Sequence, residues 1–163
     1  MRLPLHALSV FLLASLLALA AGAKTLHGVV NHVTDGDTIW VRPAGGAPVQ
    51  VRIQGLDAPE ICQAFGQQAR DALAARLLHR EVLVSTRARD IYQRSVGNVS
   101  QDGQDVGAWL VAHGYAWSTH YRGRDGPYAR EEAHARQARL GLWAVDTVEP
   151  RNFRRHHGSC RLG

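Results

Sequence analysis

Three carboxylates flank a predicted β-hairpin in sequence, one before its first strand and two after its second. Asp37 precedes a short β-branched run at residues 38–42, and Asp57 and Glu60 follow a second run at residues 49–53. The Pro- and Gly-rich segment between the runs predicts two antiparallel strands joined by a turn. In an antiparallel hairpin, the start of the first strand lies beside the end of the second. The carboxylates therefore meet at one end of the hairpin, where they can hold a hard divalent cation beside a carboxylate base.

An arginine lies on the strand that leads to this end. Arg52 alternates with Val51 and Ile53, so it projects from the more polar face of the strand. There it can contact a phosphate group, although a lone strand arginine is more often solvated. The D-G-D-T stretch at residues 35–38 also has two interpretations, part of a metal site or only a tight turn, and by itself it indicates the turn. It is not an EF-hand loop, since the later ligands and closing glutamate of that motif are absent.

The first 23 residues are typical of a secretory signal peptide. Arg2 is the only charged residue before an apolar run at residues 8–20, and A-G-A at residues 21–23 provides a small-x-small cleavage signal. The alternative is an uncleaved membrane anchor, because the charge-free stretch at residues 3–23 is almost long enough to span a bilayer. The cleavage pattern favours the signal peptide, and residues 24–163 are then expected to form a single domain.

The composition is basic and rich in arginine. The chain has 19 Lys and Arg residues and 14 Asp and Glu residues, and loss of Arg2 with the signal leaves 18 against 14, a net charge of +4. The planar guanidinium of arginine suits bidentate contact with phosphate, which is compatible with a nucleic-acid partner. A GC-rich genome explains most of the scarcity of lysine, so the charge alone supports a polyanionic partner only weakly.

The two cysteines fit an exported protein. An even count in an oxidising compartment favours a disulfide between Cys62 and Cys160. That bond would tie the loop after the D-A-P-E stretch to the C-terminal tail, whereas the alternative is two unpaired thiols. The tail carries Arg151, Arg154 and neighbouring basic residues, and we interpret it as a solvated end rather than a metal site.

The rest of the chain alternates short strands with helices. Residues 65–79 repeat apolar side chains at intervals of four, which predicts an amphipathic helix. Proline at the start, early glutamates and a final Gly141 predict another helix at residues 127–140. The other expected elements are strands at residues 26–34, 81–86 and 96–100, and a helix at residues 106–113 capped by Asp105. Five strands and about three helices favour an α+β domain built on a small closed β-barrel, a frequent platform for nucleic acids.

Two further stretches offer contacts to nucleic acid. Residues 87–94, R-A-R-D-I-Y-Q-R, read as a basic loop that can supply a second arginine, Arg94, with Tyr92 available to stack on a base. Tyr121 lies beside Arg122 in an aromatic-rich segment. A solvated basic surface explains the loop equally well, and core packing is the more common role of such dense aromatic residues.

Together these motifs resemble the staphylococcal nuclease (thermonuclease) family. D-G-D-T, V-R-I-Q-G-L-D-A-P-E, D-I-Y-Q-R and G-L-W follow one another in order from about Val29 to Trp143, most of the mature chain. The resemblance implies an OB-type five-stranded β-barrel with three helices. It also implies an enzyme that hydrolyses phosphodiester bonds in DNA and RNA and uses Ca²⁺.

The resemblance assigns roles to residues at matching positions. Asp37 and Asp57 would be calcium ligands, and the backbone carbonyl of Ala58 would be a third. Glu60 would be the general base, or the group that orients the attacking water. A phosphodiester anion repels hydroxide, so cationic groups must neutralise the charge that grows on the phosphate in the transition state.

The same resemblance gives Arg52 and Arg94 the role of binding the phosphate and stabilising its growing charge. Asp35 and Thr38 would support the metal loop. Two positions depart from the family pattern. Gln93 replaces the usual glycine before the second arginine, which predicts strain if that position adopts a left-handed turn. Gly107 replaces an asparagine that commonly helps to hold the helix after the Asp102-Gly103 turn.

We weigh three functions. A secreted or periplasmic Ca²⁺-dependent nuclease explains all five residues at which inactive barrel modules tend to differ: Asp37, Arg52, Asp57, Glu60 and Arg94. A catalytically inactive OB-fold nucleic-acid-binding module is the main alternative, and a calcium-binding structural protein leaves both arginines unexplained. We expect the nuclease, acting on DNA and RNA as a monomer with no membrane association after signal cleavage.

Overall fold

The barrel is built from five strands paired in the order β3-β2-β1-β5-β6. The structure is a computed structural model that describes residues 24–160. The strands are β1 (Lys24–Val33), β2 (Thr38–Arg42), β3 (Val49–Ile53), β5 (Glu81–Arg89) and β6 (Ser95–Gln101). The two ends of this order, β3 and β6, pair in parallel, with Val51 opposite Ser95 and Ile53 opposite Gly97. That pairing closes the barrel, as the sequence predicts.

The hairpin that carries the candidate site residues is antiparallel, as predicted. Thr38 at the start of β2 lies opposite Arg52 near the end of β3. The chain then forms a short strand β4 (Leu56–Asp57), which pairs with β8 (Trp117–Ser118) outside the main sheet. One further short strand, β7 (Gln104–Asp105), extends the edge of β6. Both ends of the hairpin therefore reach the same region of the molecule.

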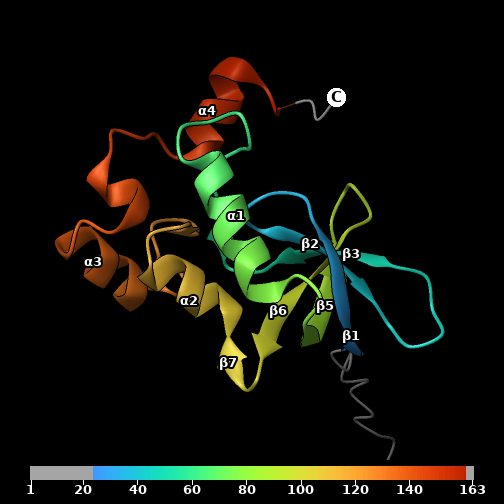
Figure 1. The fold of residues 1–163 in the computed structure, drawn as a ribbon. Coiled ribbons are helices and arrows are strands. Elements are labelled where there is room, and N and C mark those ends of the chain that lie inside the picture. Colours follow the sequence, from blue (N-terminus) through green and yellow to red (C-terminus); the bar gives the residue numbers. More distant parts are fainter. Residues whose placement is uncertain (1–23, 161–163) are drawn as a thin grey trace, which may run out of the picture.

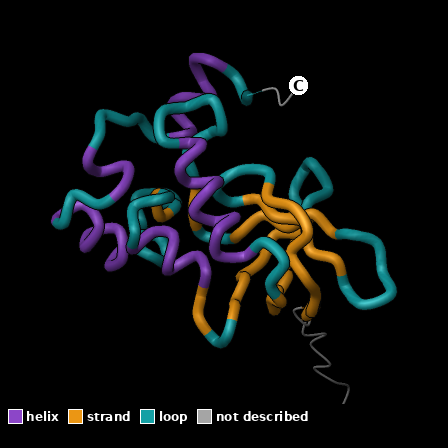
Figure 2. Tube along the Cα trace, viewed as in Figure 1, coloured by secondary structure: helices purple, strands orange, loops and turns teal. Residues whose placement is uncertain are grey.

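Helices cover one side of the barrel. Four α-helices and one 3₁₀ helix are present among residues 24–160: α1 (Gly66–Leu77), α2 (Val106–Ala112), α3 (Ala129–Gln137), η1 (Gly141–Ala144) and α4 (Pro150–His157). In Figure 1, α1 runs beside the strands, α2 and α3 lie to one side, and α4 stands next to the N-terminal end of α1. Figure 2 shows the strands gathered at one side of the molecule and the helices at the other. None of these helices is long and apolar enough to cross a bilayer.

The core lies inside the barrel and beneath the helices. Alternate strand residues point inward, which is the pattern expected of strands with one buried face. Fully buried examples from five strands and two helices are Val30, Ile39, Val51, Val84, Val99, Leu73 and Leu110. The buried core holds the strands in a fixed register, so side chains at the open end of the hairpin are carried by a rigid scaffold.

Two parts of the fold differ from the expectation. Arg87–Arg89 continue strand β5, so the predicted basic loop shrinks to a turn at residues 90–94. The C-terminal tail, expected to be a solvated end, contains α4 and packs against the site described below. The first 23 residues, where the signal peptide is expected, lie outside the described part of the chain.

The space at Gly107 is taken by a tyrosine. A Cβ atom at this position would lie 2.5 Å from the hydroxyl oxygen of Tyr128. That hydroxyl donates to Asp105 Oδ1 at 3.3 Å, and Asp105 also caps α2 by accepting the N–H of Ala108 at 3.0 Å. Burial raises the pKa of Tyr128, as does the charge of Asp105. Tyr128 thus helps to hold the start of α2 and fills the space beside Gly107.

Candidate active site

The backbone fixes Asp37 at the mouth of the hairpin. Its carbonyl oxygen accepts the N–H of Ile53 at 2.8 Å, which continues the β2–β3 ladder past Thr38. Its side chain is buried: Oδ1 accepts from the Thr38 hydroxyl at 3.0 Å, and Oδ2 accepts the N–H of Ala58 at 3.0 Å. The Ala58 bond connects the two ends of the hairpin through the carboxylate itself.

Arg52 spans the two aspartates that the sequence analysis selects as metal ligands. Its Nη1 donates to Asp37 Oδ1 at 2.7 Å, and its Nη2 donates to Asp57 Oδ1 at 2.8 Å. The charge of Asp37 raises the pKa of the Arg52 guanidinium, and Asp57 adds to this effect. One guanidinium therefore brings both carboxylates to a common centre, in agreement with the hairpin argument.

Arg154 also belongs to the cluster, although its sequence context did not mark it as a site residue. Arg154, on α4, donates from Nη2 to Asp57 Oδ2 at 2.8 Å and from Nη1 to Glu60 Oε1 at 2.8 Å. Burial disfavours the charged guanidinium, but the hydrogen bonds to Asp57 and Glu60 prevail and raise the pKa of Arg154. The sequence offered one signal for this contact, the disulfide that brings the C-terminal tail to the loop after Glu60.

Asp35 supports the same loop from the barrel side. Its Oδ1 accepts the N–H of Asp37 at 3.0 Å. Burial and the nearby charge of Asp37 raise the pKa of Asp35 to about 7. Asp35 is therefore a carboxyl group that stays protonated well above its ordinary range.

The turn after β5 aims Arg94 at the hairpin. Gln93 has a φ of 65°, so the condition for strain named in the sequence analysis is met: a non-glycine residue adopts the left-handed conformation. Asp90 braces the turn, because Oδ1 accepts the backbone N–H of Arg94 at 3.0 Å and Oδ2 accepts its Nε at 2.7 Å. Nη1 of Arg94 lies 3.4 Å from the Thr38 hydroxyl oxygen. Burial tends to raise the pKa of Asp90, but the hydrogen bonds from Arg94 outweigh this effect and lower it.

The two tyrosines occupy different surroundings. Tyr92 is exposed on the Asp90–Arg94 turn, and the Arg94 guanidinium lies 5.3 Å from its ring centroid. Tyr121 is also exposed, but its contacts are local: it bridges to Arg124 within its own turn, and the Arg122 guanidinium lies 5.2 Å from its ring. The structure places Tyr92 next to a candidate site residue, and no such contact is recorded for Tyr121.

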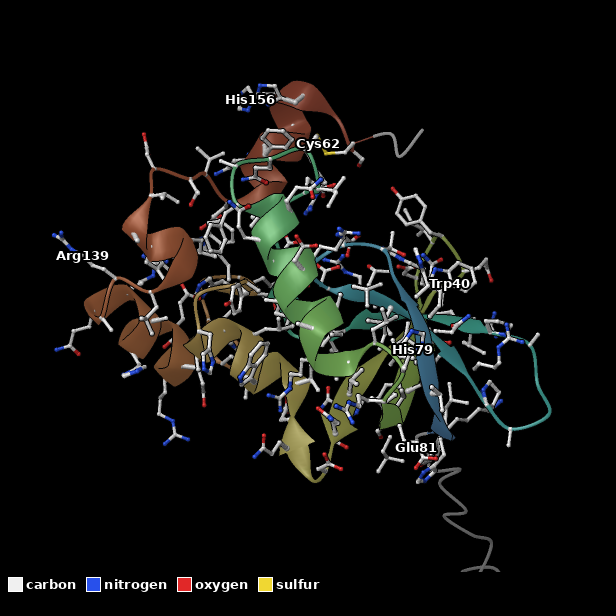
Figure 3. The ribbon with its side chains drawn as sticks, viewed as in Figure 1. Trp40, Cys62, His79, Glu81, Arg139 and His156 are labelled. Atoms are coloured by element: carbon white, nitrogen blue, oxygen red, sulfur yellow. A yellow bond between two sulfur atoms is a disulfide. The ribbon has the colours of Figure 1, made fainter. Side chains whose placement is uncertain are left out.

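A disulfide joins the site to the C-terminal helix. Cys62 and Cys160 are bonded, with 5.8 Å between their Cα atoms, so the predicted pairing is present. Figure 3 shows the yellow sulfur bond near the labelled Cys62, beside α4. A disulfide of this kind is typical of proteins that fold in an oxidising compartment.

The donors at the hairpin mouth are all oxygens. Asp37 and Asp57 contribute carboxylates, and the backbone of Ala58 is held against Asp37. Within residues 24–160, no three Asp, Glu, His or Cys side chains converge closely enough to form a metal site by themselves. A hard cation such as Ca²⁺ accepts carbonyl and water oxygens beside carboxylates, so this donor set fits it, whereas a soft metal would need sulfur or imidazole.

Comparisons with known proteins agree with this fold. Residues 50–145 match the family described as "Staphylococcal nuclease homologue". The chain is 38% identical to Protein ParB of Escherichia coli, over 91% of this chain and 90% of that protein. It is 36% identical to a Micrococcal nuclease of Shigella flexneri, over 79% and 80% of the two chains. It is 30% identical to an uncharacterized endonuclease of Haemophilus influenzae, over 90% and 83%.

The barrel and these matches define an enzyme of the nuclease class, which hydrolyses phosphodiester bonds. The chain belongs to the staphylococcal nuclease family.

Proposed function

We propose that the chain is a Ca²⁺-dependent nuclease that hydrolyses DNA and RNA by in-line attack of water, and that it works as a monomer outside the cytoplasm. The observation that carries the proposal is the Arg52 guanidinium, which bridges Asp37 and Asp57 at 2.7 and 2.8 Å beside Glu60. A purely structural strand would have no need of three carboxylates and their arginines at one mouth of the barrel.

Each residue has a distinct task. The carboxylates of Asp37 and Asp57 and the carbonyl of Ala58 would hold Ca²⁺, which would supply positive charge beside the scissile phosphate. The Glu60 carboxylate would orient a water molecule and accept its proton as the oxygen attacks phosphorus. The leaving oxygen departs on the opposite side of the phosphorus, with the electron pair of the broken P–O bond.

Two arginines would stabilise the phosphate during this step. Arg52 on β3 and Arg94 on the turn before β6 approach the hairpin mouth and present N–H groups suited to phosphate oxygens. Their effect is largest when negative charge accumulates on the five-coordinate phosphorus. Asp35 and Thr38 support Asp37 from behind, through the hydrogen bonds described above.

The location outside the cytoplasm rests on two observations. A disulfide joins Cys62 to Cys160, and the first 23 residues have the composition of a signal peptide. We therefore propose a secreted or periplasmic enzyme whose mature part, residues 24–163, is a single nuclease domain.

The decisive experiment compares rate with binding on one labelled oligonucleotide. Arg52→Ala and Glu60→Gln should each lower the single-turnover rate by about 10²–10³ while changing equilibrium binding of the oligonucleotide much less. Excess chelator should abolish cleavage by the parent. Arg155→Ala is the matched control, because Arg155 is an exposed arginine that makes no ion pair with any residue between 24 and 160. If the chain is a binding module without catalysis, neither the parent nor any variant will cleave the oligonucleotide.

A further inference from the structure

The C-terminal segment at residues 148–160, which contains α4, is attached to the loop at residues 60–63 at three points. The disulfide links Cys160 to Cys62, two residues after Glu60. Gln63 donates from Nε2 to the carbonyl oxygen of Val148, just before α4, at 2.5 Å. Arg154 provides the third attachment. Gln63 also accepts the N–H of Glu60 at 3.2 Å through its side-chain oxygen, so the loop and the helix form one bonded unit.

Arg154 holds two carboxylates with the two ends of one planar group. Its Nη2 contacts Asp57 Oδ2 at 2.8 Å, and its Nη1 contacts Glu60 Oε1 at 2.8 Å and Asp57 Oδ1 at 3.2 Å. Because Arg52 occupies Asp57 Oδ1 from the other side, both oxygens of Asp57 are bonded to guanidinium groups. A fork of this shape fixes the rotamers of both acids more firmly than a single ammonium can.

We propose that Arg154 is a positioning residue of the nuclease site, which orients Glu60 and Asp57, and that the Cys62–Cys160 disulfide keeps it there. The inference rests on the proposed function and extends the site to a residue 94 positions from Glu60 in sequence. Arg154 acts through the two acids, so it has two effects. It aligns Glu60 for the attacking water, and it occupies Asp57 Oδ2, the oxygen that Arg52 leaves open to a cation.

These two effects have opposite signs in one variant. Loss of the Arg154 charge should let the carboxylates bind Ca²⁺ about three- to tenfold more tightly, because a like charge no longer competes at Asp57. The single-turnover rate at saturating Ca²⁺ should fall about tenfold or more, because Glu60 is no longer aligned. A residue that only stabilises the fold would lower both quantities or neither.

The test uses the full mature chain and measures the two quantities separately. Calorimetric titration with CaCl₂ alone gives the affinity, and single-turnover cleavage of an oligonucleotide at saturating CaCl₂ gives the rate. Arg154→Ala should show tighter Ca²⁺ binding and slower cleavage. Arg154→Lys keeps the charge but loses the fork, so its affinity should remain near the parent value while its rate falls. Arg155→Ala removes an equal charge from the same helix and should leave both quantities near the parent values.

Reduction of the disulfide provides an independent arm. Dithiothreitol, or the Cys62→Ser/Cys160→Ser variant, should shift Ca²⁺ affinity and rate in the same directions as Arg154→Ala. In the Arg154→Ala background, reduction should add little, because both changes release the same contact.

Several outcomes would overturn the inference. Weaker or unchanged Ca²⁺ binding in Arg154→Ala, an unchanged rate in Arg154→Lys, or fully additive effects of reduction and Arg154→Ala would each contradict it. These results differ from failure of the proposed function, in which the parent itself neither binds Ca²⁺ nor cleaves. In that case both proposals fall together, whereas a parent that cleaves with Ca²⁺ isolates the role of Arg154.

Discussion

Gly36 has no room for an added methyl group in the turn that carries Asp35 and Asp37. It lies between Asp35 and Asp37 and packs against Ala58 and Ala69. A Cβ atom at Gly36 would lie 2.7 Å from the Cβ of Ala58 and 2.8 Å from that of Ala69. Neither neighbour has a rotamer that moves its methyl group away, so the backbone itself must shift. We expect Gly36→Ala to destabilise the protein and to weaken calcium binding.

The size of the effect follows from these two contacts. Restoring an ordinary separation of 3.4 Å requires movements of about 0.6 Å or more in α1 and in the loop after β4. Overpacking of this kind costs about 1–3 kcal/mol of unfolding free energy. With a urea m-value of roughly 2 kcal/mol/M, the denaturation midpoint should fall by about 0.5–1.5 M. Ala58 also donates to Asp37, so the same movement displaces a carboxylate proposed as a ligand.

A second substitution tests whether the clash is the cause. Ala69→Gly removes one of the two blocking methyl groups and by itself costs about 1 kcal/mol in a helix interior. Combined with Gly36→Ala, it should cost less than the sum of the two single changes, by about 1 kcal/mol. Urea denaturation of the four proteins and calcium titration of the folded ones provide the measurements. Additive free energies, or a Gly36→Ala variant with an unchanged midpoint and calcium affinity, would refute the packing argument.

Three further outcomes are expected. The disulfide joins residues 98 apart, so its reduction should lower the free energy of unfolding by up to about 4.7 kcal/mol through loop-closure entropy. The urea midpoint should fall accordingly, and equal midpoints with and without reductant would contradict this. Gln93→Gly should raise stability by less than about 1 kcal/mol and keep cleavage, because relief of the left-handed conformation is partly offset by a more flexible unfolded chain; a loss of cleavage would show that Gln93 has another task. The pKa of Asp35 is raised from 3.8 to about 7 in the folded protein, so the folded state binds the extra proton and its stability falls as pH rises from about 4 to 7. Asp35→Asn, measured without calcium, should flatten that part of the pH profile, and a parent-like slope would count against the shift.

The hairpin reasoning succeeded because it depends on chain geometry alone. Two β-branched runs with a Pro- and Gly-rich turn have one simple pairing, and that pairing places Thr38 opposite Arg52. The carboxylates just outside the runs, Asp37 and Asp57, then meet at the same mouth. The role of Gly36 was less visible. The sequence indicated a tight turn, but the glycine is required by the close approach of Ala58 and Ala69, which are distant in the chain.

Arg154 could not be found by the same reasoning. Its helix has only eight residues, three of them arginine and two histidine, which is a usual composition of a solvated surface. Its contact with Asp57 joins residues 97 positions apart, and no periodicity or turn signal reports such a distance. Gln93 illustrates the same limit on a smaller scale. The left-handed turn was predictable from the position, but the brace that Asp90 gives to Arg94 depends on where two side chains point.

The contact of Arg154 with Asp57 and Glu60 also follows from electrostatics, once the predicted hairpin has brought the carboxylates together. Asp37 is almost completely buried, and Asp57 and Glu60 lie beside it, so the folded chain carries three neighbouring carboxylates. Unpaired acids at such a mouth would repel one another and lose hydration, which costs more than a surface ion pair returns. Arg52 alone satisfies only one oxygen of Asp57 and none of Glu60. A second guanidinium is needed to balance the cluster while no other cation is bound, and a helix fastened by a disulfide is a reliable way to supply it. The acids selected for chemistry thus require a counter-ion that no local motif encodes.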